Sequence, residues 1–305
     1  MPDRDGVVRN VCLRLHELAD YAENPSNFGA IVGPFANRIG RAGFSLDGER
    51  YELPANNGPN SLHSGPANLA HRAWTVRESS DRHATFTIEH RHAAGGLPGP
   101  IAIQATYTVD GNTLTLGYEA TSPERPAIIN LTNHAYWNLG GLQQDGRVPG
   151  DVRGHVLQID ADQRLVVDEN VLPTGEIVAI EQTPFDFRTP RAIGDTWESQ
   201  RGYDHCFVLR PSENRSHPRR AATIADPQSG RRLTVETTQP GVQLYTANHF
   251  GGEDSNAGHQ AFDAFCLECQ HFPNSPNMPT FPSTRLAPGD TYRESTRYTF
   301  TTDDR

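Results

Sequence analysis

Side chains that can carry out chemistry gather in one apolar stretch, Asn130 to Leu139, which reads Asn-Leu-Thr-Asn-His-Ala-Tyr-Trp-Asn-Leu. Ile128 and Ile129 precede it as an apolar run, which predicts a buried strand. Burying a polar group without a partner costs roughly 1 to 3 kcal/mol, so these side chains must bond one another, water or a ligand. His134 lies among them, and an imidazole with an ordinary pKa of about 6.5 exchanges protons near neutrality. His134 is therefore a candidate proton carrier, and the alternative is a core histidine bonded to Asn133 or a carbonyl.

Further polar residues stand among apolar or glycine-rich neighbours elsewhere in the chain. They are Asn37, Arg38, His63, Asp204 and Glu268. Each has an ordinary explanation by itself, such as a surface ion pair for Arg38 or a turn for Asp204. Together with His134 they supply a carboxylate base, imidazole acids, and a cation with a second carboxylate. Sugar sites use such groups because each hydroxyl both donates and accepts a hydrogen bond.

Two short motifs resemble metal sites. Cys266 and Cys269 form C-x-x-C, but residues three apart on a strand face opposite sides, and no second cysteine pair completes a zinc site. His90 and His92 form H-x-H, but no third ligand follows in pattern, so we expect solvated surface histidines. The four cysteines are too few and too scattered for a disulfide framework, so we expect free thiols and no metal.

The elements that must position these residues are predicted to be strands, because apolar residues alternate with polar ones at a period of two and because 27 Gly and 23 Pro interrupt long helices. Asp47-Gly48 and Asp110-Gly111 are hairpin turn signals. One short helix is predicted near Pro190 to Gln200. The strands are predicted at 73–77, 84–90, 101–109, 113–118, 156–167, 204–209, 221–225, 232–237, 241–248, 265–273 and 292–301, and residues 172–177 are predicted to turn into another strand.

The pattern predicts an all-β fold, a large antiparallel β-sandwich with few short helices that curls around a cleft. No repeat, low-complexity tract or change of composition marks a linker, so we expect one domain over residues 1–305.

The formal net charge of -10, without a long basic run, argues against a nucleic-acid partner. Neither a signal peptide nor an apolar run of about 18 residues is present, so we expect no membrane association and a cytoplasmic protein.

The chain resembles the aldose 1-epimerases, also called galactose mutarotases, over nearly its whole length. The similar segments follow the family's order. They are Phe28 to Ile39, Asn60 to Gly65, Asn130 to Leu139, Val171 to Arg188, Gly202 to Leu209, Pro240 to Thr246 and Leu267 to Pro273. Many relatives differ at Pro34, at Ser64 and over 274–279, and these differences bear on specificity more than on mechanism.

The resemblance implies a galactose mutarotase-like supersandwich that needs no metal or organic cofactor. It implies that Glu268 is the general base, that His134 is the general acid, and that Arg38, His63 and Asp204 bind the sugar, with Asn37 beside them. The reaction would open and reclose the ring of a free hexose such as galactose or glucose. We expect a charged His134 and an ionised Glu268 that stabilise each other. We also expect a monomer or weak homodimer.

Two alternatives stay open at this point. A hexose-6-phosphate 1-epimerase of the same superfamily would need extra cations for the phosphate, and Arg41 near Arg38 is a candidate. A non-catalytic carbohydrate-binding β-sandwich module would bind a sugar without converting it, but such a module has no need of an acid and base pair.

Overall fold

The structure is a computed structural model that describes residues 1–196, 202–212, 214 and 216–303. Its larger sheet has nine antiparallel strands in the order β15-β12-β17-β18-β22-β9-β8-β7-β6. In that order the strands are Arg191–Ala192, Val156–Ile159, Arg219–Ala225, Arg231–Thr237, Tyr292–Thr302, Thr113–Thr121, Ile101–Asp110, His83–His90 and Thr75–Ser79.

A second sheet has five antiparallel strands in the order β14-β13-β16-β19-β20. In that order the strands are Pro173–Ala179, Ala161–Val167, Asp204–Leu209, Gly241–Tyr245 and Cys266–Gln270. Every residue of β19 and β20 is buried. Because both faces of these two strands are covered, a polar residue on them loses contact with water, which costs free energy unless a partner or a cavity compensates.

The remaining strands form four small pairs. They are β1 (Ile31–Val32) with β11 (Thr132–Asn133), β2 (Arg38–Ile39) with β5 (Ser61–Leu62), β3 (Gly43–Leu46) with β4 (Glu49–Glu52), and β10 (Ala127–Ile128) with β21 (Arg285–Leu286).

All helices in the described residues are short 3-10 helices. They are η1 (Leu18–Ala22), η2 (Gly40–Ala42), η3 (Gly65–Ala67), η4 (Leu69–His71), η5 (Ala94–Gly96), η6 (Val152–Gly154), η8 (Asp254–Asn256) and η9 (Ser275–Asn277). Among these residues we find no helix with the length and apolar character needed to span a membrane.

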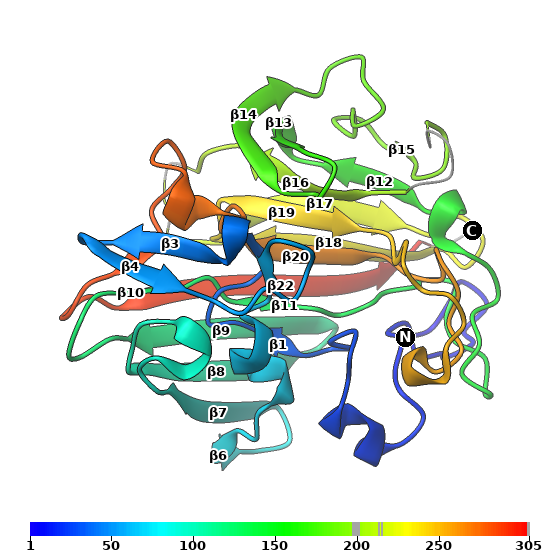
Figure 1. Cartoon of the computed structure of the whole chain (residues 1–305). Coiled ribbons are helices and arrows are strands. Elements are labelled where there is room, and N and C mark those ends of the chain that lie inside the picture. The colour runs from blue at the N-terminus through cyan, green and yellow to red at the C-terminus, as the bar shows by residue number, and fades with distance from the viewer. Residues whose placement is uncertain (197–201, 213, 215, 304–305) are drawn as a thin grey trace.

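The two large sheets pack face to face. In Figure 1, β19 and β20 lie over β18 and β22. Leu233 and Val235 of β18 share one apolar core with Val242 and Leu244 of β19 and with Leu267 of β20, and each is exposed by 1% or less. Burying such a side chain stabilises the fold by about 1.5 to 3 kcal/mol. The predicted all-β antiparallel sandwich with few short helices is therefore confirmed.

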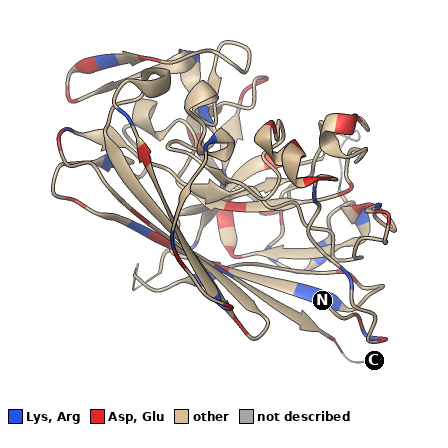
Figure 2. Cartoon of the chain, turned by 90° about the horizontal axis from the view of Figure 1, so that it is seen from below, with Lys and Arg blue, Asp and Glu red and all other residues tan. Residues whose placement is uncertain are grey.

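Acidic and basic residues are intermingled over the strands and loops (Figure 2). Many arginines pair with a carboxylate on a neighbouring strand or turn, as Arg210 does with Asp162 and Arg220 with Asp160. The structure therefore gives these cations local partners instead of gathering them into a tract.

The two predicted hairpins are present. Asp47 and Gly48 join β3 to β4, and both have positive φ (49° and 88°), as a type I′ turn requires. The second turn is shifted by one residue, because Asp110 still pairs with Thr113 and Gly111 takes the first turn position with φ 57°. The predicted strands all have observed counterparts, and 156–167 divides into β12 and β13.

The prediction of a continuous strand through Asn130 to Leu139 is wrong, since regular pairing covers Thr132–Asn133 alone. The stretch is nonetheless buried. Its polar side chains bond main-chain groups of neighbouring segments: Asn130 bonds Ala36 and His271, and Asn138 bonds Gly150 and Asp263. These bonds replace a strand ladder, because an amide side chain satisfies isolated carbonyls that have no strand partner.

Two smaller predictions also need correction. The helix predicted near Pro190 to Gln200 is absent from residues 190–196, which contain β15 and turns, and its remainder lies outside the described residues. The prediction of solvated surface histidines is wrong for His90, which is 1% exposed at the end of β7, whereas His92 lies beyond the strand and is exposed. Burial lowers the pKa of His90 to about 4.

The prediction of free thiols is confirmed. All four thiols are free. Cys266 packs in an aromatic cluster with Tyr136 and Tyr245, whereas Cys269 packs in the core between the large sheets. The two ends of the C-x-x-C motif thus face opposite sides of β20, as the strand period predicts.

Candidate active site

One face of the five-stranded sheet presents a polar row toward a cavity. Register aligns Cys206, Gln243 and Glu268 across β16, β19 and β20, and it aligns Asp204, Tyr245 and Cys266 in the next row. Because side chains alternate along a strand, these two rows lie on the same face. Gln243 donates from Nε2 to Asp204 Oδ1 at 2.6 Å, which fixes that carboxylate.

The segment around β2 and β5 supplies the opposite wall. Asn37 and His63 both have left-handed backbone, with φ of 65° and 52°, which turns the chain sharply at one end of the β2–β5 pair, just before β2 and just after β5. The Asn37 main-chain N–H donates to His63 Nδ1 at 3.1 Å. Because a main-chain N–H can only donate, the neutral His63 ring carries its proton on Nε2.

Arg38 joins the two walls. Its Nη2 lies 3.5 Å from Asp204 Oδ2, and its Nε donates to Asn57 Oδ1 at 3.0 Å. The Arg38 and Asp204 side chains are 9% and 15% exposed, so water screens this ion pair little.

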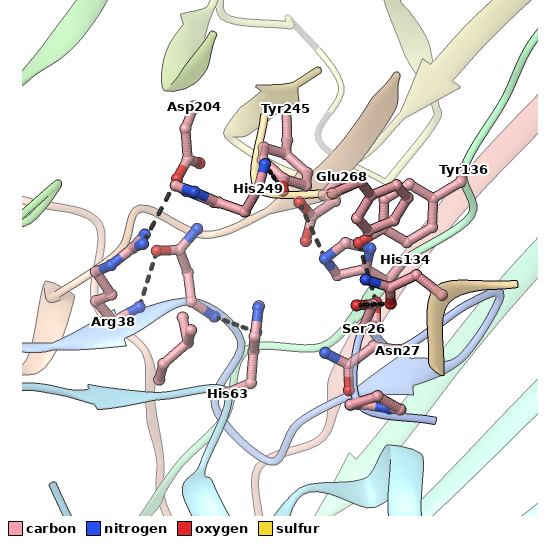
Figure 3. A pocket seen from close by; sticks show the side chains of 15 residues that line it. Ser26, Asn27, Arg38, His63, His134, Tyr136, Asp204, Tyr245, His249 and Glu268 are labelled. Atoms are coloured by element: carbon pink, nitrogen blue, oxygen red, sulfur yellow. Dashed lines mark hydrogen bonds and ion pairs between the residues drawn. The ribbon is translucent and has the colours of Figure 1, made fainter. Parts of the chain in front are cut away.

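His134 faces Glu268 inside the cavity (Figure 3). Its Nε2 lies 3.8 Å from Glu268 Oε1, and its Nδ1 lies 3.6 Å from the Cys266 sulfur. The His63 and His134 rings meet edge to face, with centroids 5.6 Å apart. The second Glu268 oxygen, Oε2, is buried without a hydrogen-bond partner. A buried atom left in this state is a position where a ligand or water completes the site.

The cavity has a volume of about 230 Å³. This is below the roughly 300 to 1,000 Å³ of sites for drug-sized molecules, so it suits a small ligand. Fifteen residues line it: Pro25, Ser26, Asn27, Asn37, Arg38, Leu62, His63, His134, Tyr136, Asp204, Tyr245, His249, Phe250, Asn256 and Glu268.

All six residues singled out in the sequence line this one cavity: Asn37, Arg38, His63, His134, Asp204 and Glu268. Residues 34, 64 and 274–279, where the chain departs from many relatives, do not line it. Ser64 instead bonds the Phe35 main chain, and Asn274 accepts the Gly40 N–H. These residues support the wall from behind.

Sequence reasoning missed other parts of the site. Tyr136 follows His134 by two residues, and its aromatic ring was a usable signal. Gln243 and Tyr245 alternate along β19, but choosing between the two faces of a fully buried strand requires knowing its partners. Ser26 and Asn256 bond each other at 2.6 Å across 230 residues, and nothing local announces that contact.

Burial sets the protonation of the central pair. It raises the pKa of Glu268 to about 8, with a further increase from Asp204 that Arg38 opposes. It lowers the pKa of His134 to about 4, against a ring hydrogen bond to its own carbonyl and the charge of Asp204. The expectation of a charged His134 beside an ionised Glu268 is therefore wrong for the pocket that the protein side chains form, because desolvation outweighs the neighbouring charges. Near neutrality the exchangeable proton is on Glu268.

Ligand atoms of His63, His134 and Glu268 lie within 4.8 Å of one another, which resembles a metal site. The Asn37 N–H argues against that use, because it keeps a proton on His63 Nε2 and so removes the lone pair that a metal would need there. This triad fits a donor to a ligand oxygen better than a ligand to a metal.

Known proteins resemble this chain along its length. A family profile described as Aldose 1-epimerase matches residues 1–299. Galactose mutarotase from Bos taurus is 39% identical over 303 residues, which cover 98% of this chain and 86% of that protein. Aldose 1-epimerase from Escherichia coli K12 is 33% identical over 311 residues, with coverage of 98% and 87%.

A solved structure agrees with these sequence matches. The aldose epimerase homologue from C. elegans superposes with a TM-score of 0.90 at 30% identity, and the match covers 100% of this chain and 91% of that one. The chain therefore belongs to the aldose 1-epimerase family, and its function is the mutarotase reaction of these isomerases.

Proposed function

We propose that Glu268 and His134 are the proton-transfer pair of this mutarotase, and that its substrates are free hexoses such as galactose and glucose. The observation that carries the proposal is their approach to 3.8 Å inside a small polar cavity, with Glu268 Oε2 left unpartnered. Arg38, His63, Asp204 and Asn37 would bind the sugar hydroxyls around this pair.

The proposed reaction opens and recloses the sugar ring. Glu268 takes the proton of the hydroxyl on C1, the O1–C1 bond becomes a carbonyl, and the electrons of the C1–O5 bond pass to O5. His134 gives its Nε2 proton to O5. Rotation about C1–C2 then presents the other carbonyl face, and the reverse transfers close the opposite anomer. Each proton transfer contributes roughly 10²- to 10⁴-fold.

One shared proton is enough for this cycle. Ring opening requires an ionised Glu268 and a protonated His134, so the shared proton, which burial places on Glu268, must first move to His134. Ring opening then leaves the proton on Glu268 and a neutral His134, which is again the arrangement that burial favours. Ring closure moves the proton back to His134 through the sugar. The environment therefore stabilises the pair as it stands beside the open-chain aldehyde, and neither step requires a proton from solvent.

Lysine chemistry has no part in the proposed mechanism. The sequence contains no lysine, so no side-chain amine is present to trap the aldehyde as a Schiff base. The open-chain sugar can return to the ring form without a covalent detour.

The phosphorylated-sugar alternative finds little support in the charges. Arg38 is the cation with a permanent charge among the lining residues, and Asp204 and Asn57 already engage it. Arg41 is exposed and does not line the cavity. A phosphate would therefore lie beside two carboxyl groups without a free guanidinium to bind it.

The proposed pair is tested with the variants Glu268→Gln and His134→Asn. Their rates of mutarotation are measured by polarimetry of freshly dissolved α-galactose and α-glucose. We expect each change to lower kcat about 10²- to 10⁴-fold. Glu294→Gln is the matched control, because burial also raises the pKa of Glu294, to about 7, but it does not line the cavity. Full turnover by either site variant would eliminate the assignment, and sugar binding without any acceleration by the unmodified protein would establish a binding module instead.

Comparing α-anomers of galactose, glucose, arabinose and xylose, with glucose 6-phosphate as the charged member, would identify the preferred aldose. The other expectations stay predictions: one domain over 1–305, a monomer or weak homodimer, a cytoplasmic location, and no nucleic-acid or membrane partner.

A further inference from the structure

The two ring nitrogens of His134 face different surroundings. Nε2 lies on the cavity side, 3.8 Å from Glu268 Oε1, whereas Nδ1 lies 3.6 Å from the Cys266 sulfur. His134 is 5% exposed and Cys266 is 0% exposed, so water does not compete at the Nδ1 side. The neutral ring has one proton, and its position decides which nitrogen can accept another.

We infer that Cys266 is a positioning residue that holds the proton of neutral His134 on Nδ1, so that Nε2 is the atom that exchanges protons with the sugar. The inference rests on the proposed role of His134 and deepens it. Cys266 does not touch the reacting atoms, and it acts through the imidazole.

The reaction also requires that the proton of neutral His134 lie on Nδ1. A ring that gives a proton from Nε2 to O5 and later takes it back must pass through a neutral form with a bare Nε2. Its remaining proton is then on Nδ1, where it needs an acceptor in a buried position. Sulfur is a weak acceptor, and the main-chain carbonyl of His134 is a second acceptor beside the ring.

The thiol itself stays protonated, because burial raises its pKa well above the ordinary value. It therefore offers sulfur lone pairs without adding a charge to a pocket that already has Glu268 and Asp204. Cys266 also precedes Glu268 by two residues on the same face of β20. One strand thus presents both the proposed base and the group that orients the proposed acid.

The experiment measures the tautomer directly, by ¹⁵N chemical shifts of the His134 ring in the full chain at neutral pH. We expect the unmodified protein to have its ring proton on Nδ1. In Cys266→Ala we expect a mixture of tautomers, a kcat about 3- to 10-fold lower, and a KM within about twofold. Cys266→Ser, which keeps an acceptor, should restore both tautomer and kcat.

Cys269→Ala is the matched control, because it lies on the same strand but faces the opposite side. It should leave the tautomer unchanged. A ring proton on Nε2 in the unmodified protein, or a Cys266→Ala variant with unchanged tautomer and kcat, overturns the inference. Failure of the proposed function would give a different result. Full activity of Glu268→Gln or His134→Asn would contradict the proposed proton-transfer pair, whichever tautomer His134 adopts.

Discussion

Arg231 and Glu268 are ionisable residues buried to a similar extent, but their surroundings are opposite. The Arg231 side chain is 0% exposed, and its guanidinium donates to main-chain carbonyls of Met1, Val7, Leu139 and Gly140. The carboxylate of Asp3 lies 3.5 Å away. The Glu268 side chain is 3% exposed, and one of its oxygens has no partner at all.

This difference distinguishes Arg231, which stabilises the fold, from Glu268, which we propose takes part in the reaction. Arg231 ties the N-terminal segment to the end of the Asn130 to Leu139 stretch, and its hydrogen bonds are complete without any ligand. Around Glu268 the unpartnered atoms include Gln243 Oε1, whose amide also holds Asp204. Buried groups without partners cost stability, and a ligand in the cavity can complete those that border it.

The largest change in stability is expected from Arg231→Met, which tests the structural role of Arg231. Arg231→Met removes the donor from four carbonyls, and we expect the free energy of unfolding to fall by about 3 to 5 kcal/mol. Activity per folded molecule should stay unchanged, because Arg231 does not line the cavity. Urea unfolding followed by fluorescence, with polarimetry at low urea, measures both.

If Arg231→Met does not fold, the unfolding of Arg231→Lys can be measured in its place. This variant keeps the positive charge but loses the planar guanidinium, so its free energy of unfolding should fall by less. Glu268→Gln is the contrast, and its stability should equal or exceed that of the unmodified protein. The comparison breaks if Arg231→Met unfolds at the same urea concentration as the unmodified protein, or if Glu268→Gln is the less stable of the two.

The sequence allowed Glu268 and His134 to be singled out because both interrupt apolar runs and both fall in segments that resemble a known family. It did not single out Arg231, which begins a strand of ordinary alternation. Its partners are main-chain carbonyls about 90 and more than 220 residues away. Every residue has such a carbonyl, so the residue type does not show which ones accept a bond from Arg231. Main-chain partners of this kind become visible when the chain is folded.

The strands were predictable because their period is local, but other features were not. The Asn130 to Leu139 stretch has the composition of a strand, yet its main-chain N–H groups donate to carbonyls of several separate segments, such as those of Ala30, Phe265 and Val11, and not to one strand partner. The protonation of Glu268 and His134 was predicted from neighbouring charges, and burial reverses it. How far a group is desolvated depends on the whole fold, so no single segment reveals it.

The pH dependence of kcat/KM tests the chemical side. If the pair must hold one shared proton, activity should be level between about pH 4 and about pH 8 and should fall about tenfold per pH unit above that range. Asp204 raises the pKa of Glu268, so Asp204→Asn should lower that pKa. The pair then loses its proton sooner, and the alkaline limb moves to lower pH.

The Arg38→Met variant should move the alkaline limb the other way, because the Arg38 charge lowers the pKa of Glu268. Complete pH profiles by polarimetry, corrected for spontaneous mutarotation, provide the measurement. Profiles of the three proteins that superpose would remove Glu268 as the titrating group.

The smallest effect is expected at an exposed arginine with similar geometry. Arg210 forms two hydrogen bonds to Asp162, at 2.9 and 2.7 Å, but the two side chains are 48% and 57% exposed. Water solvates both charges when the pair separates, so Arg210→Ala should change the free energy of unfolding by less than about 1 kcal/mol. Urea unfolding at low and high salt measures this change, which added salt should reduce further. A loss as large as that of Arg231→Met would mean that the number of hydrogen bonds, and not their removal from water, determines what an arginine contributes to this fold.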